Sequence, residues 1–152
     1  MEPTTNVHGT GLLLGSAGVL IRGPSGAGKS VLALSLLDRW EARGLPALLI
    51  ADDRVDIIAN GGALTMQAPE TLSGLIELRG RGIISRPHVA SAPLHLVIDM
   101  VPEMIRMLEE DELRTELAGV TLARAPVPFG SVISVHHQLL LVAQAIAELA
   151  TP

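Results

Sequence analysis

Residues 23–30 of the chain, GPSGAGKS, have the composition and spacing of a phosphate-binding loop. They fit the pattern Gly-x-x-x-x-Gly-Lys-Ser, in which glycines let successive backbone N–H groups converge on phosphate oxygens. The lysine of the pattern reaches the β- and γ-phosphates, and the serine hydroxyl ligates Mg²⁺. We therefore expect a site for ATP and Mg²⁺ formed by Gly23, Pro24, Ser25, Gly26, Ala27, Gly28, Lys29 and Ser30.

Phosphoryl transfer also requires a carboxylate beside the metal ion and often a base for the acceptor hydroxyl. The segment ALLIADD places Asp52 and Asp53 after an apolar run, and HLVIDM places Asp99 inside another. In an extended segment the two adjacent side chains would point to opposite faces, one toward the metal ion and one toward the acceptor. The alternative is a turn in which Asp52 caps the backbone and Asp53 pairs with Arg54. Asp99 ranks below this pair, as a strand-end residue near a turn.

Short strands and one helix must position these residues. Apolar runs at residues 19–22, 47–51 and 94–100 predict buried strands. Apolar residues at helical spacing from Lys29 to Trp40 predict a helix that stops at Gly44. Two alternating segments around Asn60-Gly61 predict a hairpin over residues 55–67.

The remaining segments carry weaker patterns. Residues 69–84 indicate a short helix or strand followed by a mobile loop, and the acidic residues 103–117 indicate a solvated, partly helical segment. Residues 120–129 predict a strand or an extended arm cut short by prolines. Residues 131–149 predict a long terminal helix.

Composition limits the class of protein. The 152 residues are enough for one domain, and the net charge of -5 with only one tryptophan and one phenylalanine argues against general nucleic-acid binding. The absence of cysteine excludes disulfides and thiolate chemistry. The first residues lack a signal-peptide pattern, and the apolar runs fall short of the roughly 20 residues that cross a bilayer. We expect a cytoplasmic protein without a membrane partner.

Four segments taken together resemble a known family. VHG, GPSGAGKS, LIADDRVDI and LIELRGRGII, in this order between about Val7 and Ile84, resemble the catalytic domain of HPr kinase/phosphorylase, with a weaker match beyond. The resemblance implies an α/β fold: a single phosphate-loop (P-loop) domain over residues 1–152, of the phosphoenolpyruvate carboxykinase-like type, with a mixed sheet and flanking helices. It also implies a protein serine kinase that uses ATP and Mg²⁺ to phosphorylate HPr, a small carrier protein of the bacterial phosphotransferase system.

The resemblance implies roles for catalytic residues. His8, in VHG upstream of the phosphate loop, matches the family's active-site histidine. Asp53, the second aspartate of ADD, matches the proton acceptor for the kinase reaction, and Lys29 matches the phosphate-binding lysine. Arg106, in EMIRML, is the best local match to a functional arginine that comes later in the family's sequence.

The same resemblance implies metal ligands and a catalytic loop. The magnesium ligands would be Ser30, Asp52 and Glu77, all of which offer the oxygen atoms that Mg²⁺ prefers. The segment 76–85 matches the catalytic loop, in which Arg79 and Gly80 are candidate functional residues.

The sequence departs from the family pattern at two points, and two other functions stand as alternatives. The family carries an amino-terminal domain, whereas this chain has few residues before His8, as in short proteobacterial forms. No lysine or arginine follows Arg124, so we rank the reverse phosphorolysis of phosphoserine-HPr below kinase activity. The resemblance implies a homo-oligomer, a hexamer. The alternatives are a phosphate-loop kinase of small molecules and a nucleotide-dependent switch without turnover.

Overall fold

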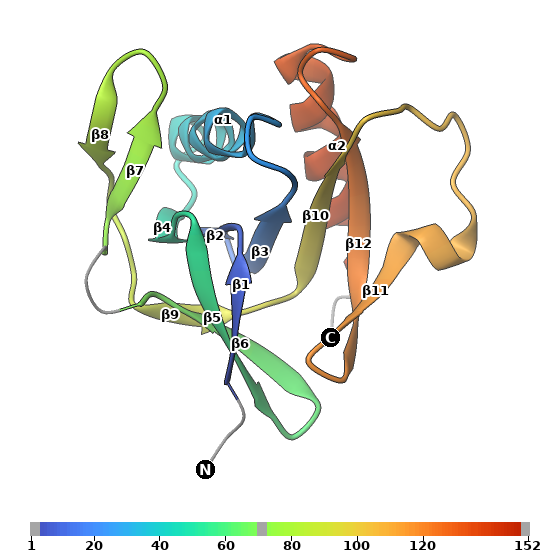
Figure 1. Ribbon diagram of the computed structural model, residues 1–152, viewed down its shortest axis with the longest axis horizontal. Coiled ribbons are helices and arrows are strands. Elements are labelled where there is room, and N and C mark those ends of the chain that lie inside the picture. The colour runs from blue at the N-terminus through green and yellow to red at the C-terminus, as the bar shows by residue number, and fades with distance from the viewer. Residues whose placement is uncertain (1–3, 70–72, 150–152) are drawn as a thin grey trace.

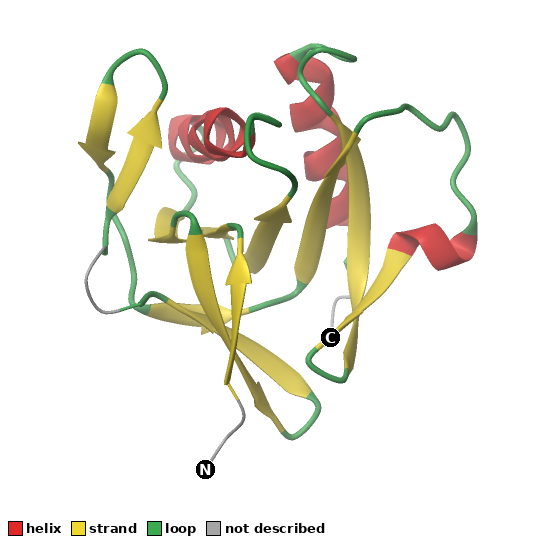
Figure 2. Cartoon of the chain, viewed as in Figure 1, coloured by secondary structure: helices red, strands yellow, loops and turns green. Residues whose placement is uncertain are grey.

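Two β-sheets and two α-helices stack in three layers, as Figures 1 and 2 show. The computed structural model describes residues 4–69 and 73–149. The middle layer is a six-stranded mixed sheet, whose strands in order across the sheet are β11 (Arg114–Leu117), β12 (Val120–Pro128), β10 (Leu96–Val101), β3 (Ala17–Arg22), β2 (Thr10–Leu14) and β4 (Ala47–Ala51).

The outer layers differ in kind. One is formed by helices α1 (Lys29–Ala42) and α2 (Val135–Ala147), and the other by an antiparallel sheet of β1 (Thr4–His8), β5 (Arg54–Asn60), β6 (Ala63–Gln67) and β9 (Ser91–Pro93). A separate hairpin of β7 (Leu75–Leu78) and β8 (Gly82–Ser85) stands beside α1, and a short 3-10 helix, η1 (Glu110–Leu113), precedes β11 (Figure 1).

The middle sheet is buried on both faces because its side chains alternate between two apolar cores. In β3, Val19 and Ile21 pack with the helices, whereas Leu20 packs with the antiparallel sheet. Continuous apolar runs therefore form these strands, in agreement with the predictions for β3, β4 and β10. The mixed sheet is confirmed; both helices cover the same face of it.

Strand direction brings the candidate site together. The strands β3 and β10 are parallel, and β4 runs in the same direction as β3 because both pair antiparallel with β2. The carboxyl ends of β3 and β4 consequently lie at one edge of the sheet. The phosphate loop follows β3 at this edge, and Asp52 and Asp53 follow β4.

Local signals in the sequence located several boundaries. Helix α1 begins at Lys29, as predicted, and Gly44 with φ of 73° donates its N–H to Glu41 at 2.9 Å beyond the end of the helix. The hairpin predicted around Asn60-Gly61 is β5 and β6. Strands β1 and β2 had no prediction, although Gly15, between two apolar runs, marks the turn from β2 to β3.

In the carboxyl-terminal half the predicted start of α2 needs correction, whereas the partly helical segment 103–117 and the strand within residues 120–129 are confirmed with different details. Helix α2 begins at Val135 instead of residue 131, because the Ser134 side chain accepts a hydrogen bond from the N–H of His137 and caps it. Within residues 103–117 only η1 is helical, and residues 114–117 are strand β11. Prolines do not cut β12 short, because in the described chain no strand pairs with its outer edge beyond Ala123.

The segment predicted to be a short helix or strand and then a mobile loop is the hairpin β7–β8. Residues 70–72 of that segment lie outside the described residues. No helix in the described chain has the length and apolar character to cross a membrane.

Candidate active site

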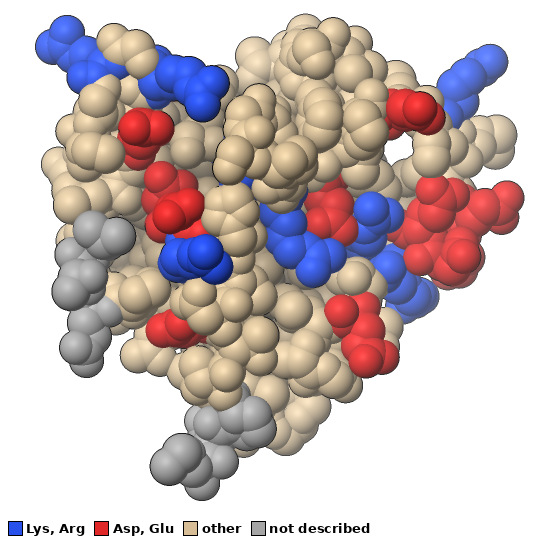
Figure 3. All heavy atoms as spheres, viewed as in Figure 1, with Lys and Arg blue, Asp and Glu red and all other residues tan. Residues whose placement is uncertain are grey.

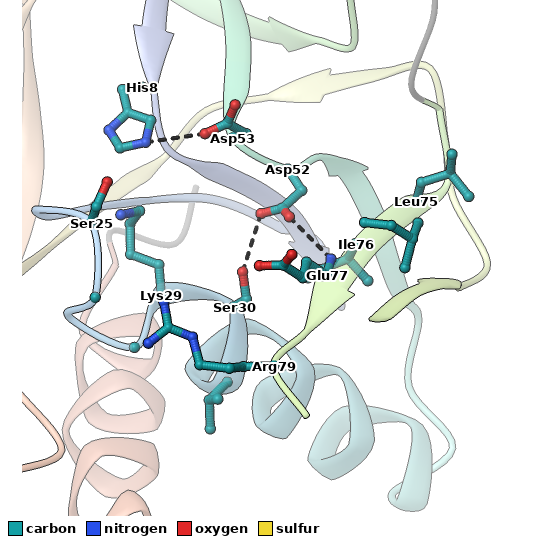
Figure 4. A pocket seen from close by; sticks show the side chains of 14 residues that line it. His8, Ser25, Lys29, Ser30, Asp52, Asp53, Leu75, Ile76, Glu77 and Arg79 are labelled. Atoms are coloured by element: carbon teal, nitrogen blue, oxygen red, sulfur yellow. Dashed lines mark hydrogen bonds and ion pairs between the residues drawn. The ribbon is translucent and has the colours of Figure 1, made fainter. Parts of the chain in front are cut away.

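A cavity of about 680 Å³ opens at the edge of the sheet where β3 and β4 end. Its wall combines the phosphate loop, the turn after β4, the end of β1 and the hairpin β7–β8 (Figure 4). The residues that line it are His8, Ser25, Gly26, Gly28, Lys29, Ser30, Val31, Asp52, Asp53, Leu75, Ile76, Glu77, Arg79 and Ile83. Most of the predicted site residues therefore share one cavity.

The phosphate loop is shaped for a ligand by its glycines. Gly26 and Gly28 have φ of 84° and 97°, in the left-handed region that side chains disfavour, and no atom lies within 4 Å of a Cβ built on either. The ammonium group of Lys29 donates to the carbonyl oxygens of Gly23 at 2.8 Å and Pro24 at 3.1 Å. Lys29 is the only lysine in the sequence. Its positive charge is thus held at the loop, without a carboxylate partner among the described residues.

Asp52 is the centre of a set of oxygen atoms. Its Oδ1 accepts a hydrogen bond from Thr10 Oγ1 at 2.8 Å and lies 3.5 Å from Ser30 Oγ, while its Oδ2 accepts from the backbone N–H of Glu77 at 3.4 Å. The Glu77 carboxylate is directed toward Asp52 and Ser30 (Figure 4). No lysine, arginine or histidine forms an ion pair with Asp52 or Glu77 among residues 4–69 and 73–149.

These three side chains fit Mg²⁺. The described chain holds no group of three or more acidic, histidine or cysteine side chains placed to bind a metal ion. Mg²⁺ usually takes one or two protein carboxylates and completes its shell with phosphates and water. Two carboxylates without a cationic partner and one hydroxyl, beside a phosphate loop, match that requirement.

Asp53 pairs with the histidine at the end of β1. Its Oδ1 lies 3.2 Å from Nε2 of His8. The extended alternative for the two aspartates is wrong, because they occupy the bend between β4 and β5, where Asp53 has φ of 72°. The turn alternative is also incomplete, because Asp53 pairs with His8 and not with Arg54. Asp52 thus faces the phosphate loop, and Asp53 faces β1.

The hairpin β7–β8 closes one side of the cavity. Arg79, in the turn directly after β7, extends across the cavity toward the phosphate loop (Figure 4). Gly80 lies in the turn with φ of 94° and does not line the cavity. Leu75 and Ile83 supply an apolar wall although their side chains are exposed. A charged phosphate site is therefore bordered by an apolar surface.

Two further candidates lie away from this cavity. Arg106 is exposed on the connection between β10 and η1 and does not line the cavity of its own chain. Asp99 instead binds two arginines: its Oδ1 lies 2.8 Å from Nε of Arg22, and its Oδ2 lies 2.6 Å from Nε of Arg124. The ranking of Asp99 below the Asp52–Asp53 pair agrees with this placement.

The Arg22–Asp99–Arg124 cluster stabilises the sheet edge next to the phosphate loop. Burial by itself raises the pKa of the Asp99 carboxyl, but hydrogen bonds from Arg22 and Arg124, together with their charges, outweigh burial and hold the pKa below its ordinary value of 3.8. Figure 3 shows basic and acidic side chains next to one another in the middle of the visible face. Because Arg22 directly precedes Gly23, this cluster fixes the strand from which the loop starts.

Thr10 is the site residue that the sequence did not reveal. Its side chain is fully buried, and its hydroxyl orients Asp52. The only sequence signal for a role of Thr10 was its position as a polar residue between the VHG segment and the apolar residues of β2. Which carboxylate it meets depends on the pairing of β2 with β4.

Comparisons with known proteins agree on one family. The profile described as HPr Serine kinase C-terminal domain matches residues 1–135. Proteins called HPr kinase/phosphorylase from Clostridium tetani and Bordetella pertussis are 32% and 31% identical to this chain, over 84% and 88% of it. These matches cover 44% and 43% of the two relatives, so the chain spans less than half the length of the curated relatives it matches.

A solved structure extends the similarity to the fold. The HPr(Ser) kinase/phosphatase from Coxiella burnetii superposes with a TM-score of 0.75 at 26% sequence identity, and the match covers 94% of each chain. A relative from Brevibacillus brevis, also called HPr kinase/phosphorylase, is 44% identical over 56% of this chain and 26% of its own length.

Proposed function

This chain belongs to the family of the HPr serine kinase C-terminal domain, and we propose that it transfers the γ-phosphoryl group of ATP to a serine of HPr. One observation carries the proposal: a single cavity joins the phosphate loop to two aspartates with different partners, Asp52 toward Ser30 and Asp53 toward His8. A nucleotide-binding switch without turnover needs no second carboxylate of this kind. A phosphoryl transferase needs one for the metal ion and one for the acceptor.

The residues divide the work by position. The phosphate-loop N–H groups, Lys29 and Arg79 hold the negative charge of the transferring phosphoryl group. Asp53 accepts the proton of the serine hydroxyl as its oxygen bonds to the γ-phosphorus and the bond to the ADP oxygen breaks, which yields ADP and phosphoserine. His8 orients the Asp53 carboxylate through the 3.2 Å contact. Ser30, Asp52 and Glu77 would hold Mg²⁺, which neutralises phosphate charge when bound.

The apolar border of the cavity supports a protein acceptor. Val31, Leu75 and Ile83 are exposed by 47%, 37% and 64% and lie next to the phosphate site. A small polar metabolite would leave these side chains in water, whereas a folded partner that presents a hydroxyl would cover them. We propose that this partner is HPr. We also propose that the chain forms a single catalytic domain over residues 1–152, that it assembles into a homo-oligomer, a hexamer, and that it is located in the cytoplasm. Arg106 stays a candidate from the resemblance alone, because it does not line the cavity of this chain.

The test is transfer of label from γ-labelled ATP to HPr in the presence of Mg²⁺. We expect label on a serine of HPr with the unmodified chain and none with Asp53→Asn, which retains shape but not basicity. Asp38→Asn, an exposed residue of α1 away from the cavity, is the matched control and should label HPr normally. Label on a small molecule but not on HPr would contradict the proposal and favour a small-molecule kinase. Nucleotide binding without any transfer would favour the switch. Adding inorganic phosphate and phosphoserine-HPr measures the reverse reaction, which we expect to be the weaker one.

A further inference from the structure

A second cavity, of about 350 Å³, lies on the other side of the phosphate loop. Its volume falls within the roughly 300–1,000 Å³ of small-molecule sites. It shares Gly26, Gly28 and Val31 with the first cavity, so the two hollows meet across the loop. The rest of its wall comes from the loop, from the connection between β12 and α2 and from the start of α2: Ala27, Phe129, Gly130, Ser131, Val135 and Gln138.

Phe129 gives this cavity an aromatic wall. It is the only phenylalanine of the sequence, and Trp40, the only other aromatic residue besides histidines, is buried in the helix-side core and lines neither cavity. The Phe129 backbone is tied down on both sides: its N–H donates to Val101 at 2.9 Å, and its carbonyl accepts from Val132 at 2.9 Å and Ile133 at 3.2 Å. The half-buried ring is thus held on fixed backbone, as a stacking partner for a planar ring needs to be.

Gln138 adds a hydrogen-bond acceptor to the apolar wall. Its side chain is only 3% exposed, and its Nε2 donates to the carbonyl of Pro128 at 2.9 Å, which fixes the orientation of the amide. Oε1 accepts no hydrogen bond from the described residues. Among the described residues, Nε of Arg39 is the only buried side-chain nitrogen or oxygen that lacks a hydrogen-bond partner. Oε1 of Gln138 is therefore accessible to solvent. In the empty cavity water can donate to this oxygen, and a ligand that enters must supply a donor in place of that water.

From these observations we infer that the second cavity binds the adenine base of the nucleotide whose phosphates lie in the phosphate loop; this assignment rests on the proposed function. The base stacks on Phe129, and its amino group donates to Oε1 of Gln138. The acceptor selects adenine over hypoxanthine and guanine, which carry a carbonyl oxygen where adenine carries the amino group. The nucleotide then spans the loop over Gly26 and Gly28, where no Cβ blocks its path.

The experiment measures binding of ATP, ITP and tripolyphosphate by calorimetry in Mg²⁺. The unmodified chain should bind ATP about fivefold to tenfold more tightly than ITP, as one net hydrogen bond implies. Phe129→Leu keeps an apolar side chain but loses the ring, so it should weaken ATP by about tenfold and leave tripolyphosphate unchanged. Gln138→Met removes the acceptor and should abolish the preference for ATP over ITP. Leu140→Ala, exposed on the same helix and outside the cavity, is the control and should change nothing.

The outcomes separate the two proposals. In one outcome, Phe129→Leu and Gln138→Met bind ATP normally and keep the ratio of the affinities for ATP and ITP, while Lys29→Ala no longer binds ATP. The base then lies elsewhere, and this inference is wrong although the proposed kinase function stands. Binding of ITP by the unmodified chain that is as tight as binding of ATP also contradicts it. If the base-dependent losses appear but HPr is never labelled, the inference holds and the proposed function fails. A chain that binds no ATP overturns both. Phe129→Leu keeps the test decisive if Gln138→Met fails to fold.

Discussion

The hydroxyl of the fully buried Thr10 donates a 2.8 Å hydrogen bond to Oδ1 of Asp52. This bond comes from β2, the strand that separates β3 from β4 in the sheet. It fixes a carboxylate that otherwise has only longer contacts, of 3.5 Å to Ser30 Oγ and 3.4 Å to the N–H of Glu77. Thr10 is a positioning residue, since it would act on the proposed magnesium site only through Asp52.

Removing the hydroxyl should weaken magnesium use. Thr10→Val retains the shape but leaves Asp52 without its donor, and we expect the Mg²⁺ concentration for half-maximal HPr labelling to rise about tenfold or more. Thr10→Ser restores the donor and should restore the lower value. ATP binding without Mg²⁺ should be unchanged in both variants. Equal Mg²⁺ dependence in Val and Ser variants would show that the hydroxyl does not position Asp52.

Asp53 should be replaceable for stability but not for activity. Its φ of 72° is tolerated by glycine and asparagine better than by alanine. Asp53→Gly and Asp53→Asn should therefore exceed Asp53→Ala by about 1 kcal/mol in the free energy of unfolding, measured by urea titration. All three should bind ATP, and none should label HPr. An alanine variant as stable as the glycine variant would refute the cost assigned to this backbone conformation.

Asp99 should make stability fall in acid. Its pKa is lower in the folded chain than the ordinary 3.8, so the ionised carboxylate stabilises the fold above that pH and the contribution disappears as pH falls through the folded value. Asp99→Asn should lower the free energy of unfolding at pH 7 by about 1–3 kcal/mol. The difference from the unmodified chain should shrink below pH 3.8. Asp111→Asn, exposed in η1, is the control; a difference that stays constant with pH would contradict the ion-pair account.

Lys29 should be essential for transfer and directly observable. Lys29→Met removes the cation that the loop carbonyls of Gly23 and Pro24 now hold, and we expect HPr labelling to fall about a hundredfold to a thousandfold. Because no other lysine exists in the sequence, any acetylated lysine that mass spectrometry detects after treatment with a lysine reagent is Lys29. ATP with Mg²⁺ should protect Lys29 from acetylation. Equal acetylation with and without the nucleotide would contradict contact with the phosphates.

Local sequence determined the parts of the site whose geometry is local. The GPSGAGKS loop, the start of α1 at Lys29 and the Asn60-Gly61 hairpin depend on backbone preferences and apolar spacing within a few residues. These signals are strong because glycine conformations and helix starts involve neighbours in the chain. Helix ends are less clear from apolar spacing alone: the predicted segment starts at residue 131, whereas Ser134 caps α2 and the helix begins at Val135.

Tertiary structure alone decided which partner each carboxylate has. The sequence placed Asp52, Asp53 and Asp99 at strand ends, yet only strand pairing brings Thr10 to Asp52, His8 to Asp53 and two arginines to Asp99. It also brings Phe129 and Gln138 to the back of the phosphate loop. The physical reason is that these contacts join segments far apart in the chain, and burial of two apolar cores, not local preference, sets how those segments pair.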